Sequence, residues 1–331
     1  MVRTRQLSIA AALGASSAGT AYGLLIEQSK RARKVIGPST EHPPRADGVY
    51  RPQGGPPVRA FRGELSLAII GDSTAAGLGC TDPEELPGVL LARGLAEETG
   101  RSVELHTYAV VGATSKTLDA QINGALLSEG QPPDAAVILI GANDVTAKLP
   151  VSGSAQRLGA AVARLRQLDT VVIVGTCPDL GAIRPIPQPL RSVVRSWSLR
   201  LARAQREQVR AAGGHPVALA DLLSPEFLTR PELLFATDQF HPSAAGYEAA
   251  SSVLLPALCS ELGVWGGGPL AVPPTRSATA EARRPTARVT AALNRGLNQR
   301  ALAGRRWAVR LLRSADARRR GGGAHNEGPG D

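Results

Sequence analysis

The stretch from Leu65 to Gly77 has the sequence LSLAIIGDSTAAG, an apolar run that ends in small and polar residues. A strand buried on both faces has a nearly continuous apolar sequence, so this run predicts a central strand of a sheet. The glycine, aspartate and serine that follow predict a tight turn into a helix. A second stretch of the same kind, AAVILIGAND, spans residues 135–144.

Outward from these two stretches, short apolar runs alternate with segments of helical spacing. The runs are Leu65–Ile70, Val103–Val111, Ala135–Ile140, Val171–Gly175 and Val217–Ala220. The helical segments are Glu84–Glu97, Ser115–Leu127, Ser154–Leu168, Leu190–Ala212 and Ser243–Leu262. This alternation predicts an α/β domain over residues 64–262, with a five-stranded parallel sheet and helices on both faces. In such a sheet the chemistry lies at the carboxyl ends of the strands.

Residues suited to nucleophilic catalysis follow these predicted strands. Ser73 comes directly after the first, and a serine hydroxyl becomes a good nucleophile only when a base takes its proton. His241 is a suitable base, because histidine titrates near neutral pH. Asp238 lies three residues before His241, so a turn could bring its carboxylate to the second ring nitrogen and fix the tautomer. We therefore predict Ser73, His241 and Asp238 as catalytic residues.

The same reaction needs donors for a developing oxyanion. Candidates are the backbone amides of Ser73 and Gly112 and the side chain of Asn143. Gly112 fits this role because a residue without Cβ lets a substrate approach the backbone. Asp72 and Asp144 are interpreted as structural, holding loops through side-chain bonds to backbone groups.

Together these motifs resemble the sequence blocks of the SGNH (GDSL-like) hydrolases. The matching residues, in the family's order, are Gly71-Asp72-Ser73, Gly112, Gly141-x-Asn143-Asp144 and Asp238-x-x-His241. The resemblance implies a flavodoxin-like three-layer α/β/α sandwich with five parallel strands. It also implies a triad of Ser73, His241 and Asp238, and an oxyanion hole formed by Ser73, Gly112 and Asn143. Thr74 stands where the family's name motif has leucine, a position that packs in the family.

The leading hypothesis is therefore a serine hydrolase that cleaves carboxylic esters through an acyl-enzyme, without metal or cofactor. Short acyl esters, lysolipids and O-acetyl groups on sugars stay open as substrates. One alternative is a catalytically silent protein of the same fold that binds a glycan or a partner protein. A second is a phosphate-binding loop at residues 71–79, but this stretch lacks the Gly-Lys-Ser/Thr ending of a P-loop and leaves His241 without a role.

The ends of the chain differ from its middle. The formal net charge is +10, and residues 263–331 contain thirteen arginines against four acidic residues. Residues 1–36 contain an uncharged stretch, Leu7–Ile26, flanked by basic residues. Three interpretations of it stay open, namely a membrane anchor, a cleaved signal peptide and a packed alanine-rich helix. Residues 37–63 are Pro/Gly-rich and predict a linker, and residues 263–331 predict a disordered basic tail, with a basic amphipathic helix as the alternative.

Charge and composition also set expectations about partners and location. We expect a monomer that acts on a small or lipid-like ester, with membrane association through the basic termini and no specific nucleic-acid partner. The protein would then be held at a membrane by its N-terminal segment or secreted to the cell envelope, and the side of the membrane stays open. The three cysteines, Cys80, Cys177 and Cys259, have the spacing of neither a disulfide framework nor a metal site.

Overall fold

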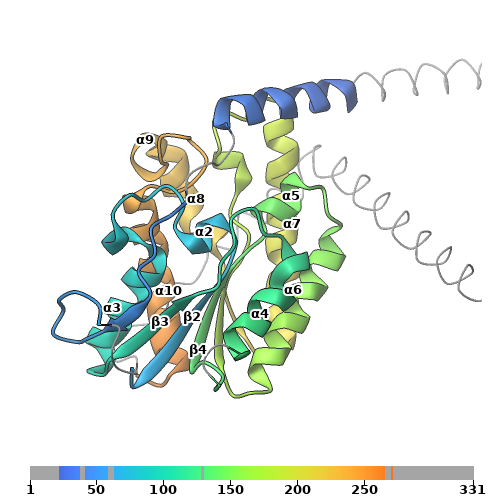
Figure 1. Ribbon diagram of the computed structural model, residues 1–331. Coiled ribbons are helices and arrows are strands. Elements are labelled where there is room, and N and C mark those ends of the chain that lie inside the picture. The colour runs from blue at the N-terminus through green and yellow to red at the C-terminus, as the bar shows by residue number, and fades with distance from the viewer. Residues whose placement is uncertain (1–21, 38–41, 59–62, 128–129, 265–269, 271–331) are drawn as a thin grey trace, which may run out of the picture.

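A six-stranded, mostly parallel sheet forms the centre of the molecule (Figure 1). The computed structural model describes residues 22–37, 42–58, 63–127, 130–264 and 270. The strand order is β1-β3-β2-β4-β5-β6. In chain order the strands are β1 (Gly48–Tyr50), β2 (Leu65–Gly71), β3 (Val103–Thr107), β4 (Ala135–Leu139), β5 (Val171–Gly175) and β6 (His215–Val217). The strands from β3 to β6 are all parallel, and β1 alone runs antiparallel to its neighbour β3.

The prediction of a five-stranded sheet is thus wrong, because the sheet has six strands. The additional strand, β1, comes from the Pro/Gly-rich stretch of residues 37–63, which was expected to be a linker. Tyr50 explains the pairing, because its ring is buried and the guanidinium of Arg93 lies 5.0 Å from the ring centroid. The backbone of Val49 also bonds Val58 in both directions, which folds the stretch back on itself.

The last predicted strand lies earlier than expected. Residues 217–220 were expected to be a strand, but β6 ends at Val217 and a helix begins at Leu219. A run of four apolar residues does not distinguish a strand from the first turn of a buried helix.

Helices cover both faces of the sheet. They are α2 (Ser73–Ala76), α3 (Pro87–Thr99), α4 (Leu118–Leu127), α5 (Ala142–Thr146), α6 (Val151–Arg166), α7 (Leu190–Ala211), α8 (Leu219–Thr229), α9 (Pro231–Leu234) and α10 (Ala244–Glu261). Short 3-10 helices are η1 (Pro83–Glu85), η2 (Ser115–Thr117) and η3 (Leu180–Ala182). Helices α3 and α10 pack together on one face, and α4, α6 and α7 cover the other.

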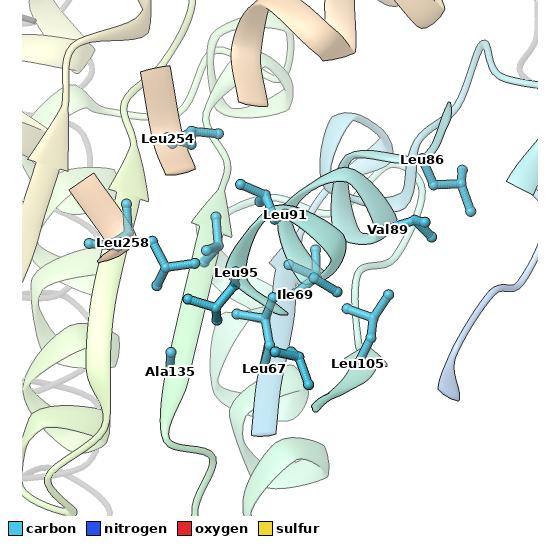
Figure 2. Close-up of a cluster of buried hydrophobic side chains, with 14 of the residues drawn as sticks. Leu67, Ile69, Leu86, Val89, Leu91, Leu95, Leu105, Ala135, Leu254 and Leu258 are labelled. Carbon is cyan, nitrogen blue, oxygen red and sulfur yellow. The ribbon is translucent and has the colours of Figure 1, made fainter. Parts of the chain in front are cut away.

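The side chains of β2 explain why this strand is apolar throughout. Leu67 and Ile69 point to one face and belong to the cluster under α3 and α10, whereas Ala68 and Ile70 belong to the cluster under α4 and α6. Figure 2 shows the first of these clusters, in which leucines of α3 and α10 meet β2 and β3. Burial on both faces fixes the register of β2, so the residues that follow it have a defined position.

A helix over residues 22–36 lies across the carboxyl edge of the sheet, above α5 and the start of α7 (Figure 1). None of the helices in the described ranges is long and apolar enough to cross a membrane. The first 21 residues of the predicted anchor or signal segment lie outside the described residues. So does the predicted C-terminal tail, apart from residues 263, 264 and 270.

Candidate active site

Ser73 is placed by a sharp turn at the end of β2. Gly71 has a φ of 144°, and a Cβ there would lie 1.9 Å from the carbonyl oxygen of Leu139 on β4, so only glycine fits. Asp72 caps α2 by accepting a hydrogen bond from the Thr74 amide at 2.9 Å. Ser73 is the first residue of α2 and is 6% exposed. Strand and helix thus fix the serine at the carboxyl edge of the sheet, as predicted.

His241 lies in a tight loop before α10. The backbones of Phe235 and Pro242 form an isolated antiparallel bridge that closes this loop. Asp238 stabilises the turn inside it, because its Oδ1 accepts hydrogen bonds from the amides of Phe240 at 2.9 Å and His241 at 3.0 Å. Ser243 then caps α10 by accepting a bond from the Gly246 amide. The loop therefore holds the imidazole in one orientation.

A continuous chain of hydrogen bonds joins the three predicted catalytic residues. Nε2 of His241 lies 2.9 Å from Oγ of Ser73, and Nδ1 of His241 lies 2.5 Å from Oδ2 of Asp238. Burial raises the pKa of Asp238, but hydrogen bonds from the His241 ring and from the Phe240 and His241 amides outweigh it, and the net pKa is lowered. An ionised Asp238 only accepts, so Nδ1 donates to it and Nε2 is free to accept from the Ser73 hydroxyl. A serine in this arrangement can be activated as a nucleophile.

The two other predicted oxyanion residues lie in the loop after β3 and at the start of α5. The Val110 amide donates to the Gly71 carbonyl at 3.1 Å, which carries the loop after β3 alongside the turn that holds Ser73. Gly112, with a φ of 80°, forms the exposed bend of this loop. Asn143 is the second residue of α5, and its Nδ2 donates to the carbonyl of Ala113 at 3.0 Å. The structure therefore brings Gly112 and Asn143 together through Ala113, at the strand ends next to Ser73.

A buried carboxylate, that of Asp144, also holds the loop after β3 in place through hydrogen bonds. Asp144 is 1% exposed and accepts hydrogen bonds from the Ser115 amide at 3.0 Å and from the Ser115 hydroxyl. Arg157 of α6 donates to the Ser115 hydroxyl at 3.0 Å. The structural interpretation of Asp72 and Asp144 is confirmed, since both accept backbone amides in turns.

Asp72 offers a test of how the buried turn responds to pH. Burial raises its pKa to about 6 from the ordinary value of 3.8, although the bond from Thr74 and the charge of His241 lower it. A raised pKa contributes stability that is present below about pH 4 and lost as the pH rises through about 6. Asp72→Asn removes this titration. The free energy of unfolding of the variant minus that of the parent should therefore rise by about 3 kcal/mol between about pH 4 and pH 8.

Urea unfolding of parent and Asp72→Asn at several pH values measures this difference. Asparagine can still accept from the Thr74 amide, so the cap is kept. Asp82→Asn is the matched control, because Asp82 caps η1 in the same way but is exposed. A difference that does not change with pH would contradict the raised pKa.

An apolar cavity of about 90 Å³ is lined by the sequence neighbours of Ser73 and His241, although neither of these two residues lines it. Its wall includes Asp72 and Thr74, which flank Ser73, and Phe240 and Pro242, which flank His241. The remaining wall comes from the ends of β4 and β5, from η3, and from one side of α8 and α10. Most of these side chains are apolar: Leu139, Ile140, Leu180, Ile183, Leu219, Leu223, Phe227 and Phe235. The cavity can therefore exclude water from an apolar group next to the serine.

The residues of this cavity and two buried glutamines were not among the predicted site residues. Three of the four phenylalanines fall within residues 227–240, a concentration that could have indicated an apolar pocket beside His241. The Gln121 side chain accepts from the Gly71 amide at 2.7 Å and donates to the Gly71 carbonyl at 2.9 Å. Gln205 accepts from the Cys177 amide at 2.7 Å and donates to the Ile140 carbonyl at 2.9 Å. Both glutamines lie on helices, and no local motif points to them.

Within the described residues, no cluster of three or more His, Cys, Asp or Glu side chains is placed to hold a metal ion. The three cysteines are free and buried. The carboxyl edge of the sheet thus presents a serine, histidine and aspartate in one hydrogen-bonded chain, with an apolar cavity beside them.

Comparisons with known proteins show the family to which the chain belongs. Residues 69–249 match the model of the GDSL-like lipase/acylhydrolase family. The chain is also 50% identical over 288 residues to the GDSL-like esterase Rv1075c of Mycobacterium tuberculosis (strain ATCC 25618 / H37Rv), a match that covers 85% of this chain and 91% of that protein. The chain therefore belongs to the GDSL-like lipase/acylhydrolase family of carboxylic ester hydrolases.

Solved structures with a similar arrangement are more distant in sequence. The lipase/acylhydrolase from Enterococcus faecalis is 20% identical, with a TM-score of 0.47 over 59% of this chain and 96% of that chain. The lipase Lip_vut3 from a goat rumen metagenome is 19% identical, with a TM-score of 0.48 over 62% of this chain and all of that chain.

Proposed function

We propose that this protein hydrolyses carboxylic esters through a covalent acyl-enzyme on Ser73. The observation that carries the proposal is the unbroken chain of hydrogen bonds from Asp238 through His241 to Ser73, with distances of 2.5 Å and 2.9 Å. The hydroxyl of Ser73 thus has a histidine nitrogen as its partner, and the other nitrogen of that ring faces a carboxylate. The alternative of a silent binding protein gives this arrangement no role.

The reaction follows from the proton positions. Nε2 of His241 takes the hydroxyl proton of Ser73 while Oγ attacks the ester carbonyl, and the imidazolium then gives that proton to the departing alcohol. A water molecule, deprotonated by the same nitrogen, attacks the acyl-enzyme, and the proton returns to Ser73 as the acid leaves. Asp238 stays ionised throughout and stabilises the imidazolium.

We assign the oxyanion hole to the amides of Ser73 and Gly112 and the side chain of Asn143. A positive φ at Gly112 turns the backbone sharply at an exposed position, where a substrate can approach it. The Asp144–Ser115 bonds and the Asn143–Ala113 bond hold the loop in place before substrate arrives. Donors that are fixed beforehand stabilise the transition state without reorganisation during the reaction.

The labelling test uses a fluorophosphonate probe on the full chain, followed by peptide mapping. We expect the phosphonyl group on Ser73 and on no other serine, because only a deprotonated hydroxyl reacts readily. Ser252 of α10 is a suitable control, since its hydroxyl donates to the Ala249 carbonyl and not to a histidine. Absence of label on folded protein, or label on a different serine, would refute the assignment.

We further propose that the acyl group of the substrate occupies the cavity beside Ser73. Its volume of about 90 Å³ is smaller than the cavity of about 150 Å³ that accommodates benzene in an engineered protein, which favours acyl groups of about two to four carbons. The apolar wall suits a hydrocarbon chain, and the position next to Thr74 and Phe240 suits the acyl side of the ester.

Enlarging the cavity should shift the preferred acyl length. For Leu223→Ala we expect the ratio of kcat/KM for p-nitrophenyl hexanoate to that for p-nitrophenyl acetate to rise about tenfold, since each methylene in an apolar pocket changes the rate by about 10-fold or more. Leu222→Ala, on the same helix but outside this cavity, is the matched control. An unchanged ratio in Leu223→Ala would place the acyl group elsewhere.

A further inference from the structure

The helix of residues 22–36 is fixed to the edge of the sheet that carries the candidate active site. Gln28 donates to the Gln188 carbonyl and accepts from the Leu190 amide at 3.0 Å, so it is bonded at both ends of its side-chain amide. Ala32 is buried in a cluster that also contains Ala142 and Val145 of α5. The helix therefore packs against α5, which carries Asn143. It lies at the same edge of the sheet as the candidate site (Figure 1).

The outer face of this helix is basic. Lys30, Arg31 and Lys34 are exposed, as is Arg33, which donates to the Thr146 carbonyl of α5 at 3.5 Å, and Glu27 is the single acidic residue among residues 22–36. The pairing of Glu27 with Lys30, at 3.7 Å, leaves an excess of positive charge toward solvent. A cluster of this kind next to apolar side chains is complementary to anionic lipid headgroups.

Exposed large apolar side chains gather on the same edge. Of the seven in the described ranges, three are on this helix, namely Tyr22, Leu24 and Val35, with exposures of 52%, 49% and 64%. Val110 in the loop after β3 and Leu233 in α9 belong to the same edge and are 54% and 50% exposed.

The two remaining residues lie at the opposite edge of the sheet. Leu127 ends α4 and Leu168 follows α6, and both of these helices run away from the carboxyl edge. We call the surface formed by residues 22–36, Val110 and Leu233 the rim face. In the described ranges, exposed large apolar side chains are thus more numerous on the rim face than at the opposite edge.

We infer that the rim face contacts the surface of a bilayer that contains anionic lipid. The carboxyl edge of the sheet, which holds Ser73 and His241, would then face the membrane. Charge complementarity and exposed apolar side chains support this occupant, and the uncharged stretch Leu7–Ile26 runs directly into the helix. Acidic residues on this edge do not cancel the basic cluster. Glu84 is bonded to Arg93 at 2.6 Å and 2.8 Å, while Asp82 precedes η1 and Glu232 lies on α9, so neither is on the basic helix.

The inference is tested with single labels on the full chain. Val35→Cys, Val110→Cys and Leu233→Cys place a polarity-sensitive fluorophore on the rim face, and Leu127→Cys and Leu168→Cys place it on the opposite edge. The native cysteines are buried, and burial raises the pKa of Cys80 to about 12 and of Cys259 to about 11, so the new exposed thiol reacts first. The vesicles are pure phosphatidylcholine, or phosphatidylcholine with one quarter phosphatidylglycerol.

With the anionic vesicles we expect a blue shift and at least a doubling of intensity at the three rim positions, and no change at Leu127→Cys and Leu168→Cys. In the Lys30→Ser/Arg31→Ser/Lys34→Ser background, the lipid concentration for half of the response should rise on the order of 100-fold, because each cation near an anionic surface contributes about a factor of five. These readouts do not depend on catalysis, so they stay informative even if Ser73 is not the nucleophile.

Three outcomes would overturn the inference. The first is an equal response at both edges, and the second is no response at the rim positions. The third is a fluorescence response to duplex DNA equal to the response to anionic vesicles, which would assign the rim face to nucleic acid instead.

Discussion

Replacing Ser73 by alanine is expected to lower kcat/KM for p-nitrophenyl acetate by about 10⁴- to 10⁶-fold, because the variant lacks the hydroxyl that would form the acyl-enzyme. The protein should stay folded, since the lost hydroxyl has His241 as its partner and an alanine at this position can still start α2. Steady-state hydrolysis, with circular dichroism on the same samples, measures both expectations.

The control for Ser73→Ala is Ser252→Ala, on the exposed side of α10. It removes a hydroxyl of the same kind, and we expect activity within about twofold of the parent. If Ser73→Ala retained more than about one tenth of the parent activity, hydrolysis would proceed without this serine and the nucleophile would have to be sought elsewhere.

His241→Ala should have an effect of similar size, about 10⁴-fold or more on kcat/KM, because the serine then has no base to accept its proton. Asp238 still accepts the backbone amides of Phe240 and residue 241, so the turn itself is expected to survive. Addition of imidazole should restore part of the activity, because the free base can occupy the space that the missing side chain leaves. The measurement is the rate as a function of imidazole concentration.

The chain provides a matched control for this histidine. Nδ1 of His215 lies 2.9 Å from Glu261, so it forms a histidine–carboxylate pair on β6 and α10, outside the chain of hydrogen bonds that contains Ser73. His215→Ala should keep activity within about twofold and show no response to imidazole. A His241→Ala protein that behaves like His215→Ala would remove His241 from the mechanism.

The parts of the fold and site that could be predicted are those determined by local sequence. Strands β2 and β4 are buried on both faces, so their apolar runs are continuous and their ends are easily recognised. Ser73 follows directly from the end of β2, and Asp238 and His241 are close in sequence, so one turn suffices to join them. The pairing of His241 with Ser73 across 168 residues was inferred from chemistry and is present in the structure.

The features that could not be predicted depend on contacts between distant segments. β1 has only three residues in a Pro/Gly-rich stretch, and it becomes a strand because β3 offers a free edge and Tyr50 is buried there. The fastening of the Gly112 loop relies on Ser115 and Asp144, which are 29 residues apart. The cavity is formed by side chains of α8 and η3 that meet only after the chain has folded.

The two buried glutamines have a consequence for how the molecule opens. Gln121 of α4 bonds both backbone groups of Gly71, and Gln205 of α7 joins the backbone ends of β4 and β5. Each side-chain amide thus pairs with backbone groups just as a peptide unit does. A local fluctuation that lifts α4 or α7 must therefore break bonds to the strand ends, so we expect these helices to open together with the carboxyl edge of the sheet rather than separately.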